Sequence, residues 1–211
     1  MSNSIFNGIE VKLDKTLENI KLPEPELLEY YNNLNERTIW IDYEIDDAII
    51  EVSKMILRFN KEDVNIPIQD RKPIKLLLFT YGGSVDVTFQ LIDVIRLSKT
   101  PVYTYNMGVS MSAGFQILIS GHKRFCLPNS IALYHSGSGK TSGTYEQTEA
   151  QMKEYKRSIT VFEQLTLAQT KIDAKTFSKN KTKEWYMDVN DQLKYGIVDS
   201  VITDLDQVYL W

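Results

Sequence analysis

Apolar residues recur at two different spacings along this chain, and the spacing changes from one segment to the next. Residues 46–59 place Ile49, Val52 and Ile56 on one helical face, whereas Ile74–Phe79 is a short apolar run typical of a buried strand. Segments of these two kinds alternate to the end of the chain. The pattern therefore predicts an α/β fold with parallel strands and right-handed crossovers.

Turn and capping residues set the boundaries of these elements. Thr144 and Gln147 have the spacing of a capping box, and the short helix that Asp188 caps ends at Gly196. Asn60–Pro73 is polar, contains two prolines and is expected to be a loop. The other expected helices are Pro25–Leu34, Asp46–Phe59, Val85–Lys99, Ala113–Ser120, Tyr145–Thr170 and Ala174–Asn180. The expected strands are Arg37–Asp42, Ile74–Phe79, Val102–Tyr105, Arg124–Leu127, Ile131–Tyr134, Trp185–Met187 and Val198–Ile202.

The two ends of the chain differ in organisation. The first 25 residues have weak periodicity and end in Leu22-Pro23-Glu24-Pro25, so we interpret residues 1–34 as an N-terminal arm or extension. Residues 35–211 are expected to form one domain, since 211 residues suffice for one large core.

Composition narrows the class of protein. The net charge of −4 argues against a nucleic-acid partner, and the apolar runs are too short to span a bilayer. The N-terminus lacks the pattern of a signal peptide. The single cysteine, Cys126, excludes an intrachain disulfide framework and indicates a reducing compartment, so we expect the cytoplasm.

Three short segments could carry chemistry. Ser112 lies among small residues at the start of an apolar helix, and His135 ends a strand. Gly82-Gly83 follows a buried strand and precedes a helix, where backbone N–H groups can face a ligand. Each signal alone is more often structural, because a serine before a helix is usually a cap. Together they supply a nucleophile, a base and oxyanion donors.

Two other kinds of site are poorly supported. Gly137–Thr141 ends like a phosphate-binding loop, but the glycine that this motif requires is replaced by Tyr134. His122 and His135 have no carboxylate or cysteine neighbours at metal-ligand spacing, so we expect no metal and no cofactor.

In combination the segments resemble the proteolytic subunit of the Clp protease (ClpP), a family of serine peptidases, over about Arg37–Leu205. The residues that carry the resemblance are Gly82-Gly83-Ser84-Val85, Gly108–Ser112, Lys123-Arg124-Phe125, Leu127-Pro128-Asn129-Ser130, His135 and Tyr195-Gly196-Ile197-Val198-Asp199. The resemblance implies a ClpP/crotonase-like spiral of βαβ units in which Tyr145–Thr170 is a protruding handle helix.

The resemblance also implies roles for individual residues. Ser112 matches the nucleophile and His135 the general base, with Ser110 as a competing nucleophile. Gly83 and Ala113 match the backbone donors of the oxyanion hole. The edges that hold an extended peptide match Gly82, Ser84 and Val85, together with part of Ser136–Thr144.

The third catalytic position departs from the family pattern. The aspartate expected there falls on Glu184, which keeps the carboxylate and adds one methylene. Asp188, four residues later, is a rival for the same role, although it has the position of a helix cap.

Further departures concern partners. The tyrosines that line the unfoldase-docking groove in the family fall on Lys75 and Leu77. The resemblance implies heptameric rings, stacked face to face, with an AAA+ unfoldase as a possible partner whose docking residues are atypical. The alternative function is a catalytically impaired structural or regulatory subunit that co-assembles with an active paralogue. A third class, acyl-CoA chemistry on the same fold, is disfavoured by Ser112 and His135 in hydrolase positions.

Overall fold

Seven strands form one sheet in the computed structural model, which describes residues 24–209. The order is β1-β2-β3-β4-β7, and β5 pairs with the distal part of β3 and with β6. Each pairing is parallel except that of β5 with β6. The predicted α/β architecture is therefore confirmed, whereas the expectation of parallel strands is wrong for β6.

The helices and strands follow the sequence pattern closely. The strands are β1 (Thr38–Ile41), β2 (Ile74–Thr80), β3 (Val102–Met111), β4 (Lys123–Cys126), β5 (Ile131–Tyr134), β6 (Trp185–Met187) and β7 (Ser200–Val201). The helices are α1 (Pro25–Asn35), α2 (Ile49–Glu62), α3 (Val85–Leu97), α4 (Ala113–Ile119), α5 (Tyr145–Gln169), α6 (Ala174–Asn180), α7 (Val189–Lys194) and α8 (Asp206–Tyr209). The capping box at Thr144 and Gln147 is present, and Asp188 caps α7.

Three segments differ from the prediction. The strand expected over Val102–Tyr105 continues to Met111, because its second half pairs with β5. The expected loop Asn60–Pro73 contains the end of α2 and a short 3₁₀ helix, Ile68–Asp70. Of the proposed arm 1–34, residues 1–23 lie outside the described part of the chain, and α1 begins at Pro25 as expected.

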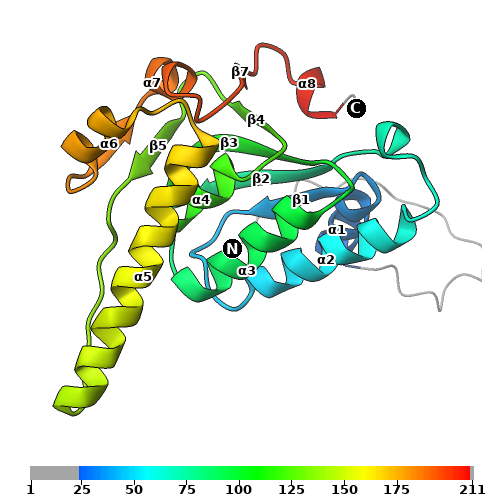
Figure 1. Cartoon of the computed structure of the whole chain (residues 1–211). Coiled ribbons are helices and arrows are strands. Elements are labelled where there is room, and N and C mark those ends of the chain that lie inside the picture. The colour runs from blue at the N-terminus through cyan, green and yellow to red at the C-terminus, as the bar shows by residue number, and fades with distance from the viewer. Residues whose placement is uncertain (1–23, 210–211) are drawn as a thin grey trace, which may run out of the picture.

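The two faces of the sheet are covered differently. Ile74, Leu76 and Leu78 of β2 point into a large core that α2, α3 and α4 cover. Leu77 points to the other face, where Ile202 and Val208 of the C-terminal segment pack on Tyr105 and Phe125. Within the described residues no helix is long and apolar enough to cross a membrane. The long helix α5 projects well beyond the sheet, and residues 136–144 run beside it (Figure 1).

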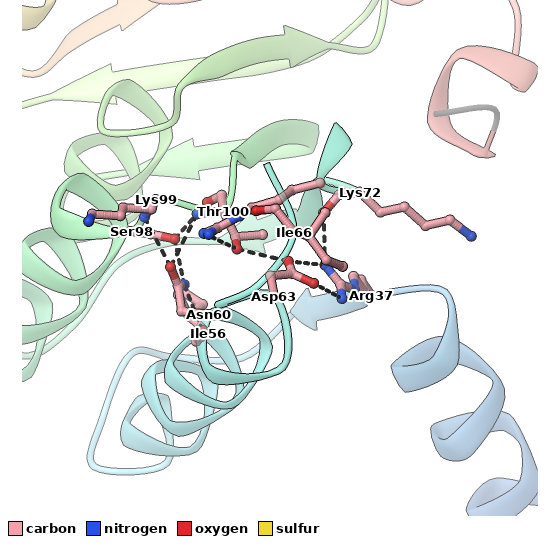
Figure 2. A network of polar contacts seen from close by, with 10 residues as sticks. Arg37, Ile56, Asn60, Asp63, Ile66, Lys72, Ser98, Lys99 and Thr100 are labelled. Atoms are coloured by element: carbon pink, nitrogen blue, oxygen red, sulfur yellow. Dashed lines mark hydrogen bonds and ion pairs between the residues drawn. The ribbon is translucent and has the colours of Figure 1, made fainter. Parts of the chain in front are cut away.

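The amino ends of the strands are tied together by a polar network (Figure 2). Arg37 donates to both carboxylate oxygens of Asp63, at 2.6 and 2.7 Å, and Thr100 donates to the same carboxylate at 2.8 Å. Asn60 accepts hydrogen bonds from the backbone N–H groups of Lys99 and Thr100. The network joins the start of β1 to the end of α2 and to the α3–β3 turn.

The carboxyl ends of β2, β3 and β5 meet at the opposite edge. These strands are parallel neighbours, so the residues that follow them emerge on one side of the sheet. Gly82-Gly83, Ser112 and His135 are the residues that follow. The fold therefore gathers the three segments that the sequence singled out.

Candidate active site

Ser112 occupies a strained turn between β3 and α4. Its φ of 54° and ψ of −118° lie outside the regions that non-glycine residues normally occupy. Such strain costs about 1–3 kcal/mol and concentrates at functional sites. Ser112 has the helix-capping position, yet its hydroxyl makes no capping hydrogen bond to α4. The structural role expected of a lone serine before a helix is therefore not the one that its side chain performs.

The hydroxyl of Ser112 contacts an imidazole instead. Ser112 Oγ lies 2.8 Å from His135 Nε2, and His135 Nδ1 lies 3.1 Å from Glu184 Oε1. A neutral imidazole that donates from Nδ1 to the carboxylate leaves Nε2 free to accept from the serine. His135 is partly buried, with 22% of its side chain exposed, whereas 60% of the Glu184 side chain is exposed. The three residues form a continuous hydrogen-bonded chain with one end in water.

The meeting of His135 and Glu184 follows from strand register. In the antiparallel β5–β6 ladder Tyr134 is opposite Trp185. His135 follows Tyr134 and Glu184 precedes Trp185, so the two residues face each other just beyond the ladder. The parallel pairing of β3 with β5 brings the end of β3, and hence Ser112, to the same place.

The two rivals named from the sequence lie elsewhere. Ser110 is fully buried within β3, and among the described residues its hydroxyl has no hydrogen-bond partner. Asp188 accepts from the backbone N–H of Asp191 at 2.9 Å and is separated from Glu184 by the whole of β6. The structure brings Ser112 and Glu184 to His135, and not Ser110 or Asp188.

Backbone N–H groups of Gly83 and Ala113 lie beside this chain. Ile45 N–H donates to Gly82 O at 2.8 Å, and Ser84 N–H donates to Ile45 O at 2.7 Å. In this parallel bridge the N–H of the intervening Gly83 points away from Ile45. Ala113 begins α4, so its N–H has no partner within the helix and carries the positive end of the helix dipole.

A glycine is required where the two turns approach each other. A Cβ on Gly82 would lie 2.7 Å from Cβ of Ser112, 2.9 Å from the carbonyl oxygen of Met111 and 3.1 Å from the nitrogen of Ala113. Gly82 also has a positive φ of 106°. Gly82 thus allows the β2–α3 turn to pack directly against the Ser112 turn.

The hydrogen-bonded chain opens into a groove of about 580 Å³. Gly82, Gly83 and Val85 line one side, and Ser136, Gly137 and Ser138 line another. Ser84, named with them from the sequence, is not among the lining residues, and its N–H is bonded to Ile45. Backbone on both sides of the groove suits an extended peptide bound by strand addition.

Some lining residues were not anticipated from the sequence. Asp42, Tyr43 and Glu44 follow β1 and reach the groove because β1 is also parallel to β2. The helix α5 contributes Tyr155, Ser158, Ile159 and Phe162. Their spacing of three and four residues is the face of one helix, so the stripe could have been found once α5 was expected to cover the site.

The groove walls include a half-buried phenol. Burial raises the pKa of Tyr43 above its usual value, and the nearby charges of Asp46 and Asp42 raise it further. Tyr43 therefore stays neutral throughout the physiological range. Among residues 24–209 no group of three or more His, Cys, Asp or Glu side chains is placed to hold a metal ion.

Comparison with known proteins places this geometry in a family. The Clp protease family model matches residues 24–205. The ATP-dependent Clp protease proteolytic subunit 2 of Corynebacterium glutamicum is 30% identical over 174 residues, covering 81% of this chain and 83% of that protein. The subunit of the same name from Treponema pallidum is 31% identical over 133 residues, covering 62% and 67%. A point mutant of ClpP1 from Listeria monocytogenes superimposes with a TM-score of 0.71 at 26% identity, covering 84% of this chain and 98% of that one.

Proposed function

Because this chain belongs to the Clp protease family, we propose that it is a serine endopeptidase that cleaves peptides or unfolded proteins through an acyl-enzyme at Ser112. Membership supports a peptidase subunit of the ClpP type. The observation that carries the proposal is the hydrogen-bonded chain from Ser112 through His135 to Glu184. No cofactor takes part in the proposed chemistry.

Acylation begins with proton transfer. His135 Nε2 takes the proton of Ser112 Oγ as the oxygen attacks the carbonyl carbon of the scissile bond. The tetrahedral intermediate collapses, the C–N bond breaks, and His135 gives its proton to the departing amine. Glu184 holds the imidazole in the required tautomer and stabilises the imidazolium that forms between these steps.

Deacylation repeats these steps with water as the nucleophile. His135 removes a proton from water, which attacks the acyl carbon, and then returns the proton to Ser112 Oγ as the acid product leaves. In both halves the backbone N–H groups of Gly83 and Ala113 donate to the oxyanion. Preorganised donors of this kind are worth about 3–4 kcal/mol each in transition-state stabilisation.

The substrate is expected to bind as an added strand. The backbone of Gly82, Gly83 and Val85 on one side and residues 136–138 on the other would pair with an extended peptide. Enclosure of the site in the proposed ring assembly would keep folded proteins out. Short peptides and unfolded chains are therefore the proposed substrate class.

Assembly is expected to enclose the site. Family membership supports ring-like self-assembly, and we propose two stacked heptameric rings joined through α5, in a reducing cytoplasm. Residues 35–211 would form the peptidase domain and residues 1–34 the arm.

An AAA+ unfoldase is a possible partner, with atypical docking. Lys75 and Leu77, at the docking positions named from the sequence, are buried. Leu77 packs with Val208, and the Lys75 ammonium lies 6.0 Å from the Tyr209 ring centroid. The chain's own C-terminal segment therefore covers these positions.

A second candidate is a catalytically impaired subunit that co-assembles with an active paralogue. The observation that favours it is the exposure of Glu184, since a solvated carboxylate stabilises an imidazolium less than a buried one does.

Labelling with a fluorophosphonate separates the two candidates. Wild type and Ser112→Ala would be compared by intact mass, with the assembly state measured on the same samples. The peptidase proposal expects one adduct per chain on wild type and none on the variant. An assembled wild type that gives no adduct would refute it and favour the impaired subunit.

A further inference from the structure

His135 and Glu184 face each other at a point where the strand ladder has already ended. The last pair of the ladder is Tyr134 with Trp185. Beyond this pair, ladder hydrogen bonds no longer hold the segments that continue β5 and precede β6 at a fixed separation. Something else must therefore keep the imidazole and the carboxylate within 3.1 Å of each other.

A set of side-chain hydrogen bonds closes the gap on the far side of this pair. Ser136 Oγ donates to the carbonyl oxygen of Lys181 at 2.5 Å. Tyr155 of α5 donates its hydroxyl to the carbonyl oxygen of Ser136 at 3.3 Å. Lys181 Nζ donates to both carboxylate oxygens of Glu163, also on α5, at 2.8 and 3.0 Å. We name Ser136, Tyr155, Glu163 and Lys181 the 136–181 clamp.

We propose that the 136–181 clamp positions the His135 imidazole against the Glu184 carboxylate, so that its members are positioning residues for the proposed peptidase reaction. The β5–β6 ladder holds the His135–Glu184 pair on one side, and the 136–181 clamp holds it on the other. This inference rests on the proposed function for its kinetic consequence, but not for the geometry itself.

Because Glu184 is exposed, its contact with His135 needs support from both sides. A long, solvated carboxylate gains little from a single surface contact and loses side-chain entropy when it is held there. A rigid backbone on both sides of Glu184 lowers that cost, because fewer conformations have to be excluded. The Glu163–Lys181 pair is better protected, with 22% and 34% of the side chains exposed.

The glycine that follows Ser136 leaves room for the 136–181 clamp. Gly137 has a φ of 81°, and a Cβ there would lie 2.9 Å from the Tyr155 hydroxyl oxygen. The residue after Ser136 therefore has to be small for Tyr155 to reach the Ser136 carbonyl. This close approach brings residues 136–139 against α5 at the point where they leave His135.

The test removes the central hydrogen bond and leaves the fold intact. Ser136→Ala is expected to lower kcat about tenfold with KM unchanged, since misplacement of a catalytic group weakens the transition state and not the binding of substrate. Ser136→Thr, which keeps the hydroxyl, should restore most of the rate. Ser178→Ala, an exposed serine on α6, is the matched control and should leave kcat unchanged.

Tyr155 provides a second variant. Tyr155→Phe is expected to lower kcat about threefold through loss of one long hydrogen bond. Tyr145→Phe removes an exposed hydroxyl from the same helix and serves as its control. Ser136→Ala and Tyr155→Phe enzymes that were both as fast as wild type would overturn the proposal.

A double-mutant cycle shows whether the clamp acts through Glu184. In a Glu184→Gln background, Ser136→Ala should change kcat by less than about twofold, because the contact that the clamp maintains is already impaired. A further tenfold loss in that background would mean that Ser136 acts independently of Glu184, and the proposal would fail.

A spectroscopic readout separates this inference from the proposed function. The chain has two histidines, so the imidazole resonances of protein labelled at histidine can be assigned with one His135→Gln variant. The His135 resonances should move in Ser136→Ala in the direction that Glu184→Gln moves them. His122, whose Nδ1 accepts from Val102 N–H at 3.0 Å, should not move. Unchanged His135 resonances in Ser136→Ala would overturn the proposal for the 136–181 clamp. A Ser112 that does not react with the fluorophosphonate would refute only the peptidase proposal.

Discussion

The length of the carboxylate side chain at position 184 provides a sharp test of the proposed triad. Glu184→Asp restores the aspartate that the family pattern has at this position, yet it shortens the side chain by one C–C bond, about 1.5 Å. The contact of 3.1 Å would open to about 4.6 Å, which is too long for a hydrogen bond. The backbone is held by β6 and by the Ser136–Lys181 bond, so it cannot follow the shorter side chain. The family-like aspartate should therefore be the poorer residue in this chain.

The expected loss follows from the exposure of the carboxylate. Removing the charge of a buried triad acid costs about 10⁴-fold in kcat. Because 60% of the Glu184 side chain is exposed, water already screens its charge, and we expect a smaller loss of about 10²-fold for Glu184→Gln. Glu184→Asp should lose a similar factor. Glu184 does not line the groove, so KM should be unchanged in both variants.

The assay is steady-state hydrolysis of a fluorogenic peptide, with the rate of fluorophosphonate labelling measured in parallel. Glu149→Gln, which neutralises an exposed carboxylate on α5, is the control. A Glu184→Asp enzyme as fast as wild type would show that side-chain length does not set the contact. A Glu184→Gln enzyme as fast as wild type would remove Glu184 from the triad.

Four other measurements test the structure at separate points. Asp63→Asn breaks the buried pair with Arg37 and should cost about 3–5 kcal/mol, lowering Tm in thermal melts by roughly 10 °C relative to the exposed control Asp70→Asn. The hydrogen bond from Arg37 holds the pKa of the Asp63 carboxyl below its usual range. The ionised carboxylate therefore stabilises the fold above about pH 4, and this stabilisation is lost as the pH falls through the lowered pKa. In Asp63→Asn this part of the fall of unfolding free energy with decreasing pH should be absent. Because Ser112 has a positive φ, Ser112→Gly should be about 1 kcal/mol more stable than Ser112→Ala in urea, and the opposite order would contradict the strain. Asp42 and Glu44 line the groove, and no lysine or arginine among the described residues does. Peptides with arginine should therefore have a kcat/KM about fivefold higher than those with glutamate. A Glu44→Gln enzyme that kept the whole difference would exclude the groove carboxylates as its cause.

Most elements of the fold could be predicted because their periodicity is strong. The helix α3 and the strand β5 begin at the predicted residues, and the long helix α5 begins at Tyr145 after its capping box. The extent of β3 could not be predicted, because Asn106 and Gly108 have low strand propensity. Pairing with β5 supplies the hydrogen bonds that hold this stretch extended.

The site was predictable in part. The resemblance to the family named Ser112, His135 and Glu184, and the structure brings these three side chains together. The same reasoning left Ser110 and Asp188 open, because a sequence does not give the direction of a side chain. Burial of Ser110 in β3 and the capping bond of Asp188 are consequences of packing. The clamp was not anticipated, since Ser136 and Lys181 are 45 residues apart and meet through a carbonyl oxygen.

The sequence by itself determined the alternating strands and helices, the glycines of the β2–α3 turn and a serine and a histidine as candidate reactive groups, because these depend on local periodicity and residue chemistry; the carboxylate came from the resemblance to the family. The tertiary structure alone decided which groups meet. Strand register places His135 opposite Glu184, and the strained turn against which Gly82 packs aims Ser112 at the imidazole. Register and packing arise from contacts between residues distant in the chain, and no local pattern encodes those distances.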